Sequence, residues 1–343
     1  MRIGVLTAGG DAPGLNAALR AIGRSVWAQS HELIGIHDGW AGLADGYRAE
    51  ELTRHHLSGI LGLGGTALGS IRYNLDQPAG GREQVLRVIS EKLDALIAIG
   101  GDGTLSIASW LADQGAPVVG VGKTLDNDLA NTDYCIGFDS AVSVVAESLD
   151  RLHTTAASHH RVLVLETMGR ATGWVATMGG LAGGADYIVI PEVPVTLTDI
   201  ADHVRRRHRQ GSSFSIVVVA EGVSVESLGG PATRASETDA LGREQLGSRG
   251  VGHFVSDQIA KLTGFESRCT VLGYLQRGGS PTAVDRIWAT RVGAAAADLV
   301  MAGRYGLMPT VRGGQVDTMP IADAISEPHP VPEHLYRLAA RFF

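Results

Sequence analysis

The sequence predicts an α/β protein built on mostly parallel sheets. Short apolar runs alternate with helical patterns along the chain, and most of these runs lack the polar alternation of a half-exposed strand. Strands that alternate with helices form parallel sheets, because each helix carries the chain back to the start of the next strand. The 46 glycines fit many tight strand-to-helix turns, and 343 residues are enough for two domains.

Seven segments have the composition of strands that are buried on both faces. They are short, rich in β-branched residues and bounded by glycine or acidic residues. The predicted strands are Arg2–Thr7, Leu93–Ile99, Pro117–Val121, Arg161–Glu166, Tyr187–Ile190, Ser215–Ala220 and Thr270–Leu275.

Helical patterns lie between the predicted strands. The first opens after a glycine turn, and the last has apolar residues four positions apart, as one face of a helix requires. The predicted helices are Pro13–Trp27, Leu105–Gln114, Ser140–His153 and Asp199–Arg207.

The overall composition narrows the possible functions. Hydrophobic residues make up 44% of the chain and charged residues 19%, as in ordinary globular proteins. The net charge of −7 argues against a nucleic-acid partner, so a phosphate ligand would be bound by a few focused cations. The apolar runs are too short to span a membrane, and Met1 leads straight into a predicted strand. We therefore expect a cytoplasmic protein with neither a nucleic-acid nor a membrane partner.

Two other features are expected to be structural. Cys135 and Cys269 stand in apolar surroundings, which predicts buried thiols and no disulfide framework. Residues 223–250 are polar and rich in glycine, which predicts a surface insertion.

The segment Ile97–Thr104, IAIGGDGT, combines the end of a strand, a glycine turn and an acidic residue. Backbone N–H groups in such a turn can surround a phosphate. Asp102 could bind Mg²⁺, because this hard cation takes carboxylate oxygen together with phosphate oxygens. Alone the motif is moderately specific, since kinases of NAD and of diacylglycerol contain similar strings.

About twenty residues later, VGKTLDND places two carboxylates after another strand. Asp126 and Asp128 are separated by one residue, with Lys123 and Thr124 just before them. One carboxylate could accept a proton from a hydroxyl, while the other tunes it or helps to hold a metal. A proton acceptor close to a phosphate-binding turn indicates a phosphoryl-transfer enzyme.

Weaker motifs follow other strands. TAGGDAPGLN (Thr7–Asn16) could bind an anion at a helix N-terminus, or could be a purely structural glycine turn. Its glycine spacing and Asp11 do not fit a dinucleotide-binding turn. In ETMGR, Arg170 could donate two hydrogen bonds to a phosphate, although an arginine after a strand is usually solvated.

Together these motifs resemble the short bacterial phosphofructokinases. The resemblance runs from Met1 to Phe343 through TAGGDAPGLN, GGTALGSIR, GGDGT, GKTLDND, MGR and LGYLQRGGSP. It implies two doubly wound, Rossmann-like α/β domains with the active site in the cleft between them. Residues 1–137 with about 276–326 would bind the phosphoryl donor, and residues 138–275 with about 327–343 the sugar phosphate. It also implies a homotetramer, with a dimer as the alternative, in which a neighbouring subunit completes the sugar site.

The resemblance also implies roles for individual residues. Asp126 corresponds to the base that takes the proton from the C1 hydroxyl of fructose 6-phosphate, and Asp102 to the Mg²⁺ ligand. The other implied catalytic residues are Lys123, Thr124, Asp128 and Arg170. The donor contacts are Gly10, Arg72, Tyr73, Gly103 and Thr104. The sugar-phosphate contacts are Thr124, Asp126, Met168, Gly169, Arg170, Glu221, Tyr274 and Arg277 from one subunit, with Arg161 and Arg268 from its neighbour.

The implied donor depends on two positions. ATP users of the family typically carry glycine at the positions of Gly103 and Lys123, whereas pyrophosphate users typically carry aspartate and lysine. This chain has a mixed pair. We expect Gly103 to make ATP the favoured donor. An aspartate side chain there would occupy the space of the nucleotide α-phosphate and would repel its negative charge. A pyrophosphate-dependent phosphotransferase remains the alternative.

The sugar and the class of protein each allow a second hypothesis. Tyr274 stands where the family often has histidine, and tyrosine donates a hydrogen bond without a positive charge, so sedoheptulose 7-phosphate or another ketose phosphate stays open. A lipid or NAD kinase would leave LDND, MGR and QRGG without a role. A non-catalytic regulatory relative would be expected to lose Asp126 or Asp102, and both are present.

Overall fold

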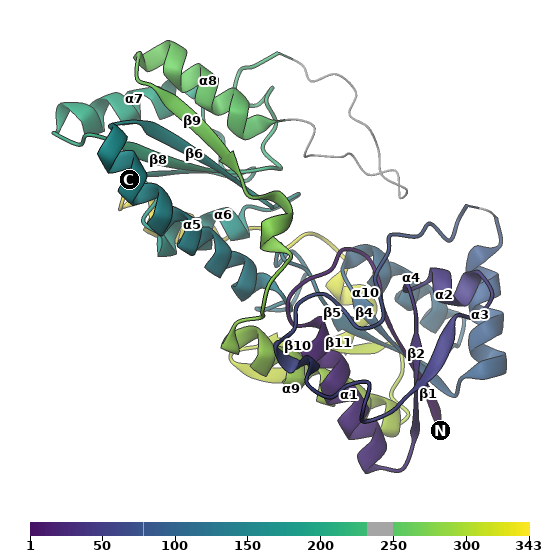
Figure 1. Ribbon diagram of the computed structural model, residues 1–343. Helices are drawn as coiled ribbons and strands as arrows, with labels where there is room; N and C mark the ends of the chain where they lie inside the picture. Colours follow the sequence, from purple (N-terminus) through teal and green to yellow (C-terminus); the bar gives the residue numbers. More distant parts are fainter. Residues whose placement is uncertain (78, 232–249) are drawn as a thin grey trace. The chain divides into compact units, whose positions relative to one another are not determined.

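The computed structural model describes residues 1–77, 79–231 and 250–343, which form two compact units (Figure 1). Unit 1 comprises Met1–Ser140 and Arg277–Pro328, and unit 2 comprises Ala141–Gln276 and His329–Phe343. Residues 232–249, most of the segment predicted as a surface insertion, lie outside the described residues.

Unit 1 is built on a five-stranded sheet with the order β3-β2-β1-β4-β5. All neighbours are parallel except β2 and β3. The order reverses at β1, which creates the point in an open α/β sheet where ligands usually bind. The strands are β1 (Arg2–Thr7), β2 (Glu32–Ile36), β3 (Ala49–Leu52), β4 (Ala95–Gly100) and β5 (Val118–Gly122). A separate antiparallel pair comprises β10 (Leu307–Arg312) and β11 (Gln315–Pro320).

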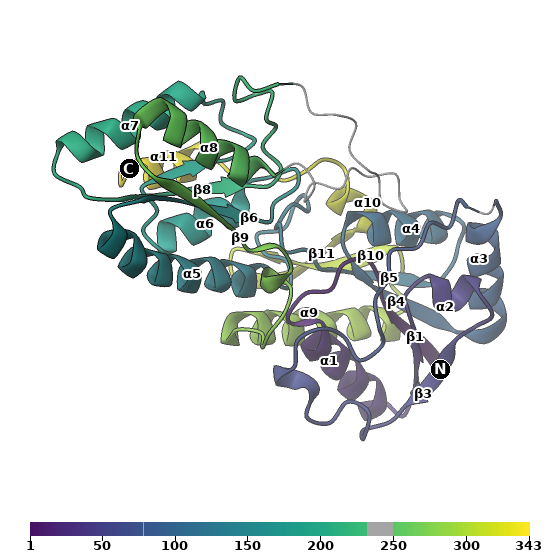
Figure 2. The same ribbon diagram turned by 45° about the horizontal axis from the view of Figure 1, so that its top comes forward.

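Helices cover both faces of this sheet (Figure 2). Alternate strand residues such as Ile97 and Val119 pack with α1 (Leu15–Ala28) and α9 (Ala283–Met301). The residues between them, such as Leu96 and Val118, face the opposite helices. Those are α3 (Gly81–Lys92), α4 (Asp102–Asp113), α10 (Ile321–Ala324) and α2 (Ala41–Ala44). A 3₁₀ helix, η1 (Ile60–Gly62), packs with α1 on the first face.

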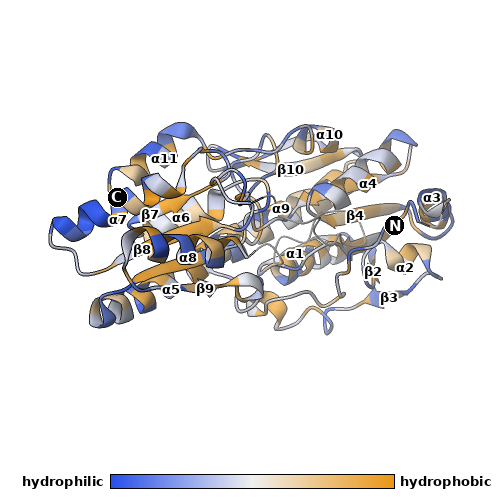
Figure 3. Ribbon diagram, turned by 90° about the horizontal axis from the view of Figure 1, so that it is seen from above, coloured by the Kyte–Doolittle hydropathy of each residue, from blue (hydrophilic) through white to orange (hydrophobic). Residues whose placement is uncertain are grey.

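Unit 2 has a four-stranded, fully parallel sheet with the order β7-β8-β6-β9. Its strands are β6 (Val162–Thr167), β7 (Tyr187–Val189), β8 (Ser215–Ala220) and β9 (Ser267–Val271), and the 3₁₀ helix η3 (Gly273–Gln276) follows β9. The helices are α5 (Phe138–His159), α6 (Trp174–Ala182), α7 (Leu197–Arg209), α8 (Val251–Thr263) and α11 (Glu333–Ala340). In Figure 3 the sheets carry the orange of hydrophobic residues, while the arginine-rich end of α7 is blue.

The predicted α/β class with mostly parallel sheets is confirmed. The bounds of β1 and β8 are those predicted, and four other predicted strands are shifted or shortened by one or two residues. The predicted strand Thr270–Leu275 is wrong: β9 ends at Val271, and Gly273, with φ of 47°, begins the 3₁₀ helix. No helix in the described ranges is long and apolar enough to cross a bilayer.

Candidate functional site

Three loops meet at the carboxyl edge of the sheet in unit 1. They follow the parallel strands β1, β4 and β5, whose last residues are in register: Thr7 pairs with Ile99, and Gly100 with Gly122. The fold therefore brings together TAGGDAPGLN, GGDGT and GKTLDND, which are far apart in the sequence.

The turn after β1 is held tightly by its neighbours. Gly9 has φ of 87°, a conformation that glycine adopts without strain. Its N–H donates to the carbonyl of Ile71 at 3.2 Å, and its own carbonyl accepts from Ser70 Oγ at 2.8 Å. A Cβ at Gly10 would lie 2.7 Å from a guanidinium nitrogen of Arg277, so only glycine fits there without a shift of that side chain. The turn and the arginine are packed directly against each other.

The predicted donor contacts of GGDGT form the start of α4. Asp102, Gly103 and Thr104 are its first three residues, directly after Gly101 at the N-cap. Thr104 is buried, Gly103 is half-buried and Asp102 is exposed. N–H groups in the first turn of a helix have no partner within the helix, and the helix dipole favours an anion there. This end of α4 can therefore bind a phosphate group.

Lys123 extends from the end of β5 to the turn after β1. Its side chain is only 4% exposed, and Nζ donates to the carbonyl of Gly10 at 2.5 Å. The pKa of Lys123 is lowered to about 8, mainly by burial and also by the charge of Arg277, while nearby aspartates oppose both effects. The ammonium group is therefore still mostly charged at neutral pH.

The segment Thr124–Asp128 presents its carboxylates through local hydrogen bonds. The N–H of Asp126 donates to Thr124 Oγ1 at 3.2 Å, and Thr124 Oγ1 donates to Asp128 at 2.9 Å. Between the carboxylates, buried Asn127 adopts φ of 51°, and its side-chain oxygen accepts from the N–H of Cys135 at 2.8 Å. Asn127 thus anchors the loop, while half-buried Asp126 and Asp128 flank it.

Two neighbouring carboxylates affect Asp128. Its pKa is raised to about 6, mainly by burial and also by the charges of Asp126 and Asp102, while the Thr124 hydroxyl opposes this. In the described residues, no three His, Cys, Asp or Glu side chains are arranged to hold a metal ion by themselves. Mg²⁺ usually binds through one or two carboxylates plus substrate phosphates, so this acidic, oxygen-rich edge fits it chemically.

The other two predicted donor contacts follow the segment that packs on the glycine turn. Arg72 is exposed. Tyr73 is half-buried and its hydroxyl donates to Asp45 at 2.7 Å, a bond that raises the pKa of Tyr73. The ring of Tyr73 also packs against the hydrophobic cluster around α3 and α4. The hydroxyl of Tyr73 thus has a partner within the protein.

In unit 2, the predicted sugar-phosphate contacts follow parallel strands at one edge of the sheet. Thr167 at the end of β6 pairs with Ala220 at the end of β8, so Met168 and Glu221 begin neighbouring loops. The N–H of Glu221 donates to the carbonyl of Thr167 at 2.9 Å. The N–H of Met168 donates to the side chain of fully buried Gln276 at 2.7 Å.

The remaining predicted contacts differ in their exposure. Gly169 adopts φ of 141°, and Arg170 beside it is half-buried. Tyr274, in η3 after β9, is 84% exposed. The structure brings Met168, Gly169, Arg170 and Glu221 together at this edge of the sheet.

Arg161 and Arg268 lie towards the opposite, amino edge of the same sheet. Arg161 immediately precedes β6, and Arg268 pairs with Leu163 in the register between β9 and β6. Both arginines form ion pairs with Glu266, at 2.8 Å and 2.6 Å. These two cations hold the pKa of Glu266 below its usual range. Strand rise separates this end from the Met168 loop by about 20 Å.

Arg277 belongs to unit 1, whereas the predicted sugar-phosphate contacts Met168, Gly169, Arg170 and Glu221 belong to unit 2. Its guanidinium group packs on Gly10 and donates to the carbonyl of Asp11 at 3.0 Å. The group has five N–H donors, so this contact leaves capacity for an anionic ligand.

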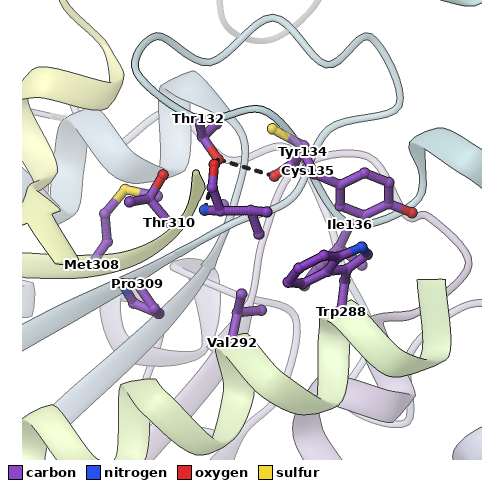
Figure 4. A pocket seen from close by; sticks show the side chains of 11 residues that line it. Thr132, Tyr134, Cys135, Ile136, Trp288, Val292, Met308, Pro309 and Thr310 are labelled. Atoms are coloured by element: carbon purple, nitrogen blue, oxygen red, sulfur yellow. Dashed lines mark hydrogen bonds between the residues drawn. The ribbon is translucent and has the colours of Figure 1, made fainter. Parts of the chain in front are cut away.

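A small pocket in unit 1 lies apart from these loops (Figure 4). It is lined mainly by apolar groups between β5, α9 and β10, including Trp288, Val292 and Met308. Its volume is about 10 Å³, room for about one water molecule. None of the predicted site residues lines it.

Four residues of these loops were not predicted from the sequence. Ser70 lies within the GGTALGSIR motif, Asn127 stands between the two aspartates, and Gln276 precedes Arg277 in QRGG. Their place in these motifs was the available signal. For Glu266 there was no signal beyond its proximity to Arg268 in the sequence. Its ion pair with Arg161 joins two distant segments, and such a pair is not visible in a sequence.

Comparisons with known proteins give a consistent result. Residues 2–300 match the family model described as Phosphofructokinase. The ATP-dependent 6-phosphofructokinase of Chloroflexus aurantiacus is 49% identical over 342 residues, covering 97% of this chain and 93% of that protein. The pyrophosphate–fructose 6-phosphate 1-phosphotransferase of Amycolatopsis methanolica is 47% identical over 345 residues, covering both chains completely (100%).

Solved structures show the same fold. Phosphofructokinase from Saccharomyces cerevisiae superposes with a TM-score of 0.81 at 30% identity, covering 95% of this chain but only 45% of the yeast chain. Pyrophosphate-dependent phosphofructokinase from Marinobacter aquaeolei gives a TM-score of 0.81 at 25% identity, covering 97% and 86% of the two chains.

Proposed function

Because this chain belongs to the phosphofructokinase family, we propose that it phosphorylates fructose 6-phosphate at O1 with ATP, yielding fructose 1,6-bisphosphate in glycolysis. One observation carries the proposal. The glycine turn, the N-terminus of α4 and the paired aspartates all lie at the carboxyl edge of one parallel sheet. A phosphate site beside a proton acceptor is what phosphoryl transfer requires.

Unit 1 would bind the donor and carry the base. The turn containing Gly10 and the first turn of α4, with Gly103 and Thr104, offer backbone N–H groups to phosphates, and Arg72 and Tyr73 flank them. Asp102 would hold Mg²⁺, and the ion, when bound, neutralises charge on the phosphate oxygens.

Asp126 would accept the proton of the attacking hydroxyl. Its main-chain N–H is tied to Thr124, whose hydroxyl donates to Asp128, so the three residues form one hydrogen-bonded set. A positioned base of this kind removes the proton from O1 while the bond between O1 and phosphorus forms. Arg170 would balance the negative charge of the transferring group.

Unit 2 would bind the sugar phosphate through Met168, Gly169, Arg170, Glu221 and Tyr274, with Arg277 contributed from unit 1. Arg161 and Arg268 would serve a neighbouring subunit. Their position near the amino edge of the sheet, away from the Met168 loop, supports this role. The proposal therefore includes a homo-oligomer, a tetramer or alternatively a dimer, acting in the cytoplasm.

Pyrophosphate as donor is the second candidate. Lys123 favours it, as does the full-length similarity to the Amycolatopsis methanolica enzyme. Gly103 favours ATP, because it leaves open the start of α4 where a nucleotide's α-phosphate would otherwise meet a carboxylate. A kinase of another ketose phosphate, such as sedoheptulose 7-phosphate, would differ from the proposed enzyme only in its acceptor. The residue that leaves this acceptor open is Tyr274.

The deciding experiment is a side-by-side assay of purified protein. With fructose 6-phosphate and Mg²⁺, ATP should give a much higher kcat/KM than pyrophosphate. Efficient use of pyrophosphate with no use of ATP would instead establish the second candidate. Replacing fructose 6-phosphate by sedoheptulose 7-phosphate tests the acceptor, and a higher kcat/KM with the heptulose would overturn the proposed sugar.

Gly103→Asp tests the physical reason for the ATP preference. The new carboxylate would stand next to Asp102 at the start of α4 and repel an incoming α-phosphate. We expect kcat/KM for ATP to fall by at least about tenfold, since like charges in such a place cost several kcal/mol. An unchanged kcat/KM for ATP would remove Gly103 as the determinant.

A further inference from the structure

The glycine turn Gly9–Asp11 is held through its carbonyl groups by side chains from three separate parts of the chain. All of them lie in unit 1. The donors to the three successive carbonyls are, in order, Ser70 Oγ at 2.8 Å, Lys123 Nζ at 2.5 Å and a guanidinium nitrogen of Arg277 at 3.0 Å. Three successive peptide groups are thus fixed from outside the turn.

Fixing a carbonyl also fixes the N–H of the next residue. The peptide group is planar and trans, so the two bonds point in opposite directions. Ser70 therefore orients the N–H of Gly10, and Lys123 orients the N–H of Asp11. Within the described part of the chain, neither of these N–H groups donates to a protein acceptor. Both are available to an anion on the side of the turn away from the two side chains.

Lys123 is poorly placed for direct contact with a ligand. Its main-chain N–H donates to the carbonyl of Gly100 at 2.9 Å, and its side chain is 4% exposed. Nζ has three N–H groups, one of which is held by the carbonyl of Gly10, and the protein covers almost all of the side chain.

We propose that Lys123 is a positioning residue that orients the glycine turn towards the phosphoryl donor. This inference rests on the proposed function. An oriented turn serves ATP and pyrophosphate alike, so this role is separate from any influence of Lys123 on the choice of donor. Ser70 has the same role for the preceding peptide group, without a charge.

Lys123→Met and Ser70→Ala test the proposal together. Methionine preserves length and packing but cannot donate, and alanine removes only the hydroxyl. We expect Lys123→Met to raise KM for the donor by about tenfold or more, and Ser70→Ala by about threefold, as the loss of one hydrogen bond implies. KM for the sugar phosphate should stay within about twofold. In the double variant the two effects should combine less than multiplicatively, because both act on one turn.

A large effect of Lys123→Met with a normal Ser70→Ala enzyme would overturn the proposal, because charge rather than orientation would then matter. Loss of pyrophosphate binding alone, with ATP binding unchanged, would also overturn it. If Lys123→Met does not fold, a raised donor KM in Ser70→Ala supports the mechanism, and an unchanged value contradicts it.

Hydrogen exchange distinguishes failure of this inference from failure of the proposed function. The N–H of Gly9 is bonded to Ile71, and its protection reports the order of the turn whether or not the enzyme is active. Exchange in a peptide covering residues 8–14 should be about tenfold faster in Lys123→Met. Unchanged exchange there would refute the positioning role. A wild-type protein inactive with both donors would refute only the proposed function.

Discussion

Asp126 is the residue on which turnover should depend most directly. It is half-buried at the carboxyl edge of the sheet, and the hydrogen bond from its N–H to Thr124 fixes its main chain. We expect Asp126→Asn to lower kcat by about 10²–10⁴-fold with little change in either KM, since the amide keeps the shape but cannot accept the proton. Steady-state kinetics of the purified variant measure this.

The matched control is Asp113→Asn, which makes the same chemical change at an exposed position at the far end of α4. It should leave kcat within about twofold, as surface substitutions usually do. Near-normal turnover by Asp126→Asn would assign the base to another residue.

At the residue scale, the motifs predicted which side chains meet but not how they are held. The approach of GGDGT to LDND follows from the pairing of β4 with β5, whereas the alternation of apolar runs and helices indicated a parallel sheet but not its strand order. The contact between Lys123 and Gly10 depends on where a flexible side chain ends, and four rotatable bonds leave that open in the sequence. Asn127 was missed because its role requires a left-handed conformation that only the folded loop displays.

At the scale of elements, Asp285 joins the beginnings of two long helices. It lies in the first turn of α9 and is fully buried. Its carboxylate accepts four hydrogen bonds, two of them from the N–H and hydroxyl of Ser140 in the first turn of α5. The others come from Tyr134 Oη and the N–H of Gly137, at 2.6 Å and 2.7 Å. This one side chain fixes where α5 starts.

We therefore expect Asp285→Asn to lower the thermal midpoint by about 6 °C or more. The amide directs N–H groups at existing donors, and each buried group left unpaired costs about 1–3 kcal/mol. Tyr134→Phe removes a single donor and should lower the midpoint by only about 2–4 °C. Scanning calorimetry compares the two. Equal midpoints for Asp285→Asn and wild type would exclude this role.

His203 in α7 makes the packing of unit 2 sensitive to acid. The ring is buried against Tyr187 and Phe343, and its Nδ1 accepts from Arg206 at 2.7 Å. The pKa of His203 is lowered to about 4, mainly by burial and also by the charges of Arg206 and Arg207. Arg207 itself forms an ion pair with the carboxylate of Asp186, at 2.6 Å.

The sign of the pH effect follows from linkage. In the unfolded chain His203 takes up a proton near pH 6.5, but in the folded protein only near pH 4. Its contribution to stability is therefore complete above pH 6.5 and is lost progressively down to pH 4, by roughly 3 kcal/mol. In denaturant unfolding across this range, the free energy of unfolding of wild type should fall relative to that of His203→Phe as the pH is lowered. Parallel pH profiles would contradict the assignment.

The elements that were predicted and those that were missed differ in a physical way. Ser215–Ala220 is apolar throughout and buried on both faces, so its bounds could be read from composition. β9 is exposed at Arg268 and Val271, and further apolar residues follow in η3. The end of this strand therefore cannot be read from the composition. The helix α9 is rich in alanine, which gives it a weak amphipathic pattern although it packs closely on α1.

At the scale of the whole molecule, the alternation of strands and helices predicted the α/β class, whereas the division into two α/β domains was implied by the family resemblance. The sequence could not predict where Arg161 and Arg268 lie, since that depends on which end of a strand each residue occupies. Both lie near the amino edge of the sheet in unit 2 and share Glu266, about 20 Å along the strand from the Met168 loop. Within unit 2, these arginines therefore lie away from the loops that we propose bind the sugar phosphate.

If the two arginines complete a neighbour's site, activity should be recovered by mixing two inactive variants. Arg161→Ala subunits retain Asp126, and Asp126→Asn subunits retain Arg161, so a hybrid pair contains one intact site and one site with both defects. With random pairing about the interface, roughly a quarter of all sites should be intact, and kcat should return to roughly a quarter of the wild-type value. The matched control mixes Asp126→Asn with Arg277→Ala. Asp126 and Arg277 belong to unit 1 of the same chain, so this pair should recover nothing. Hybrids isolated through two different affinity tags that show no more activity than the parents would rule out shared sites, and Arg161 and Arg268 would then act within their own subunit or not at all.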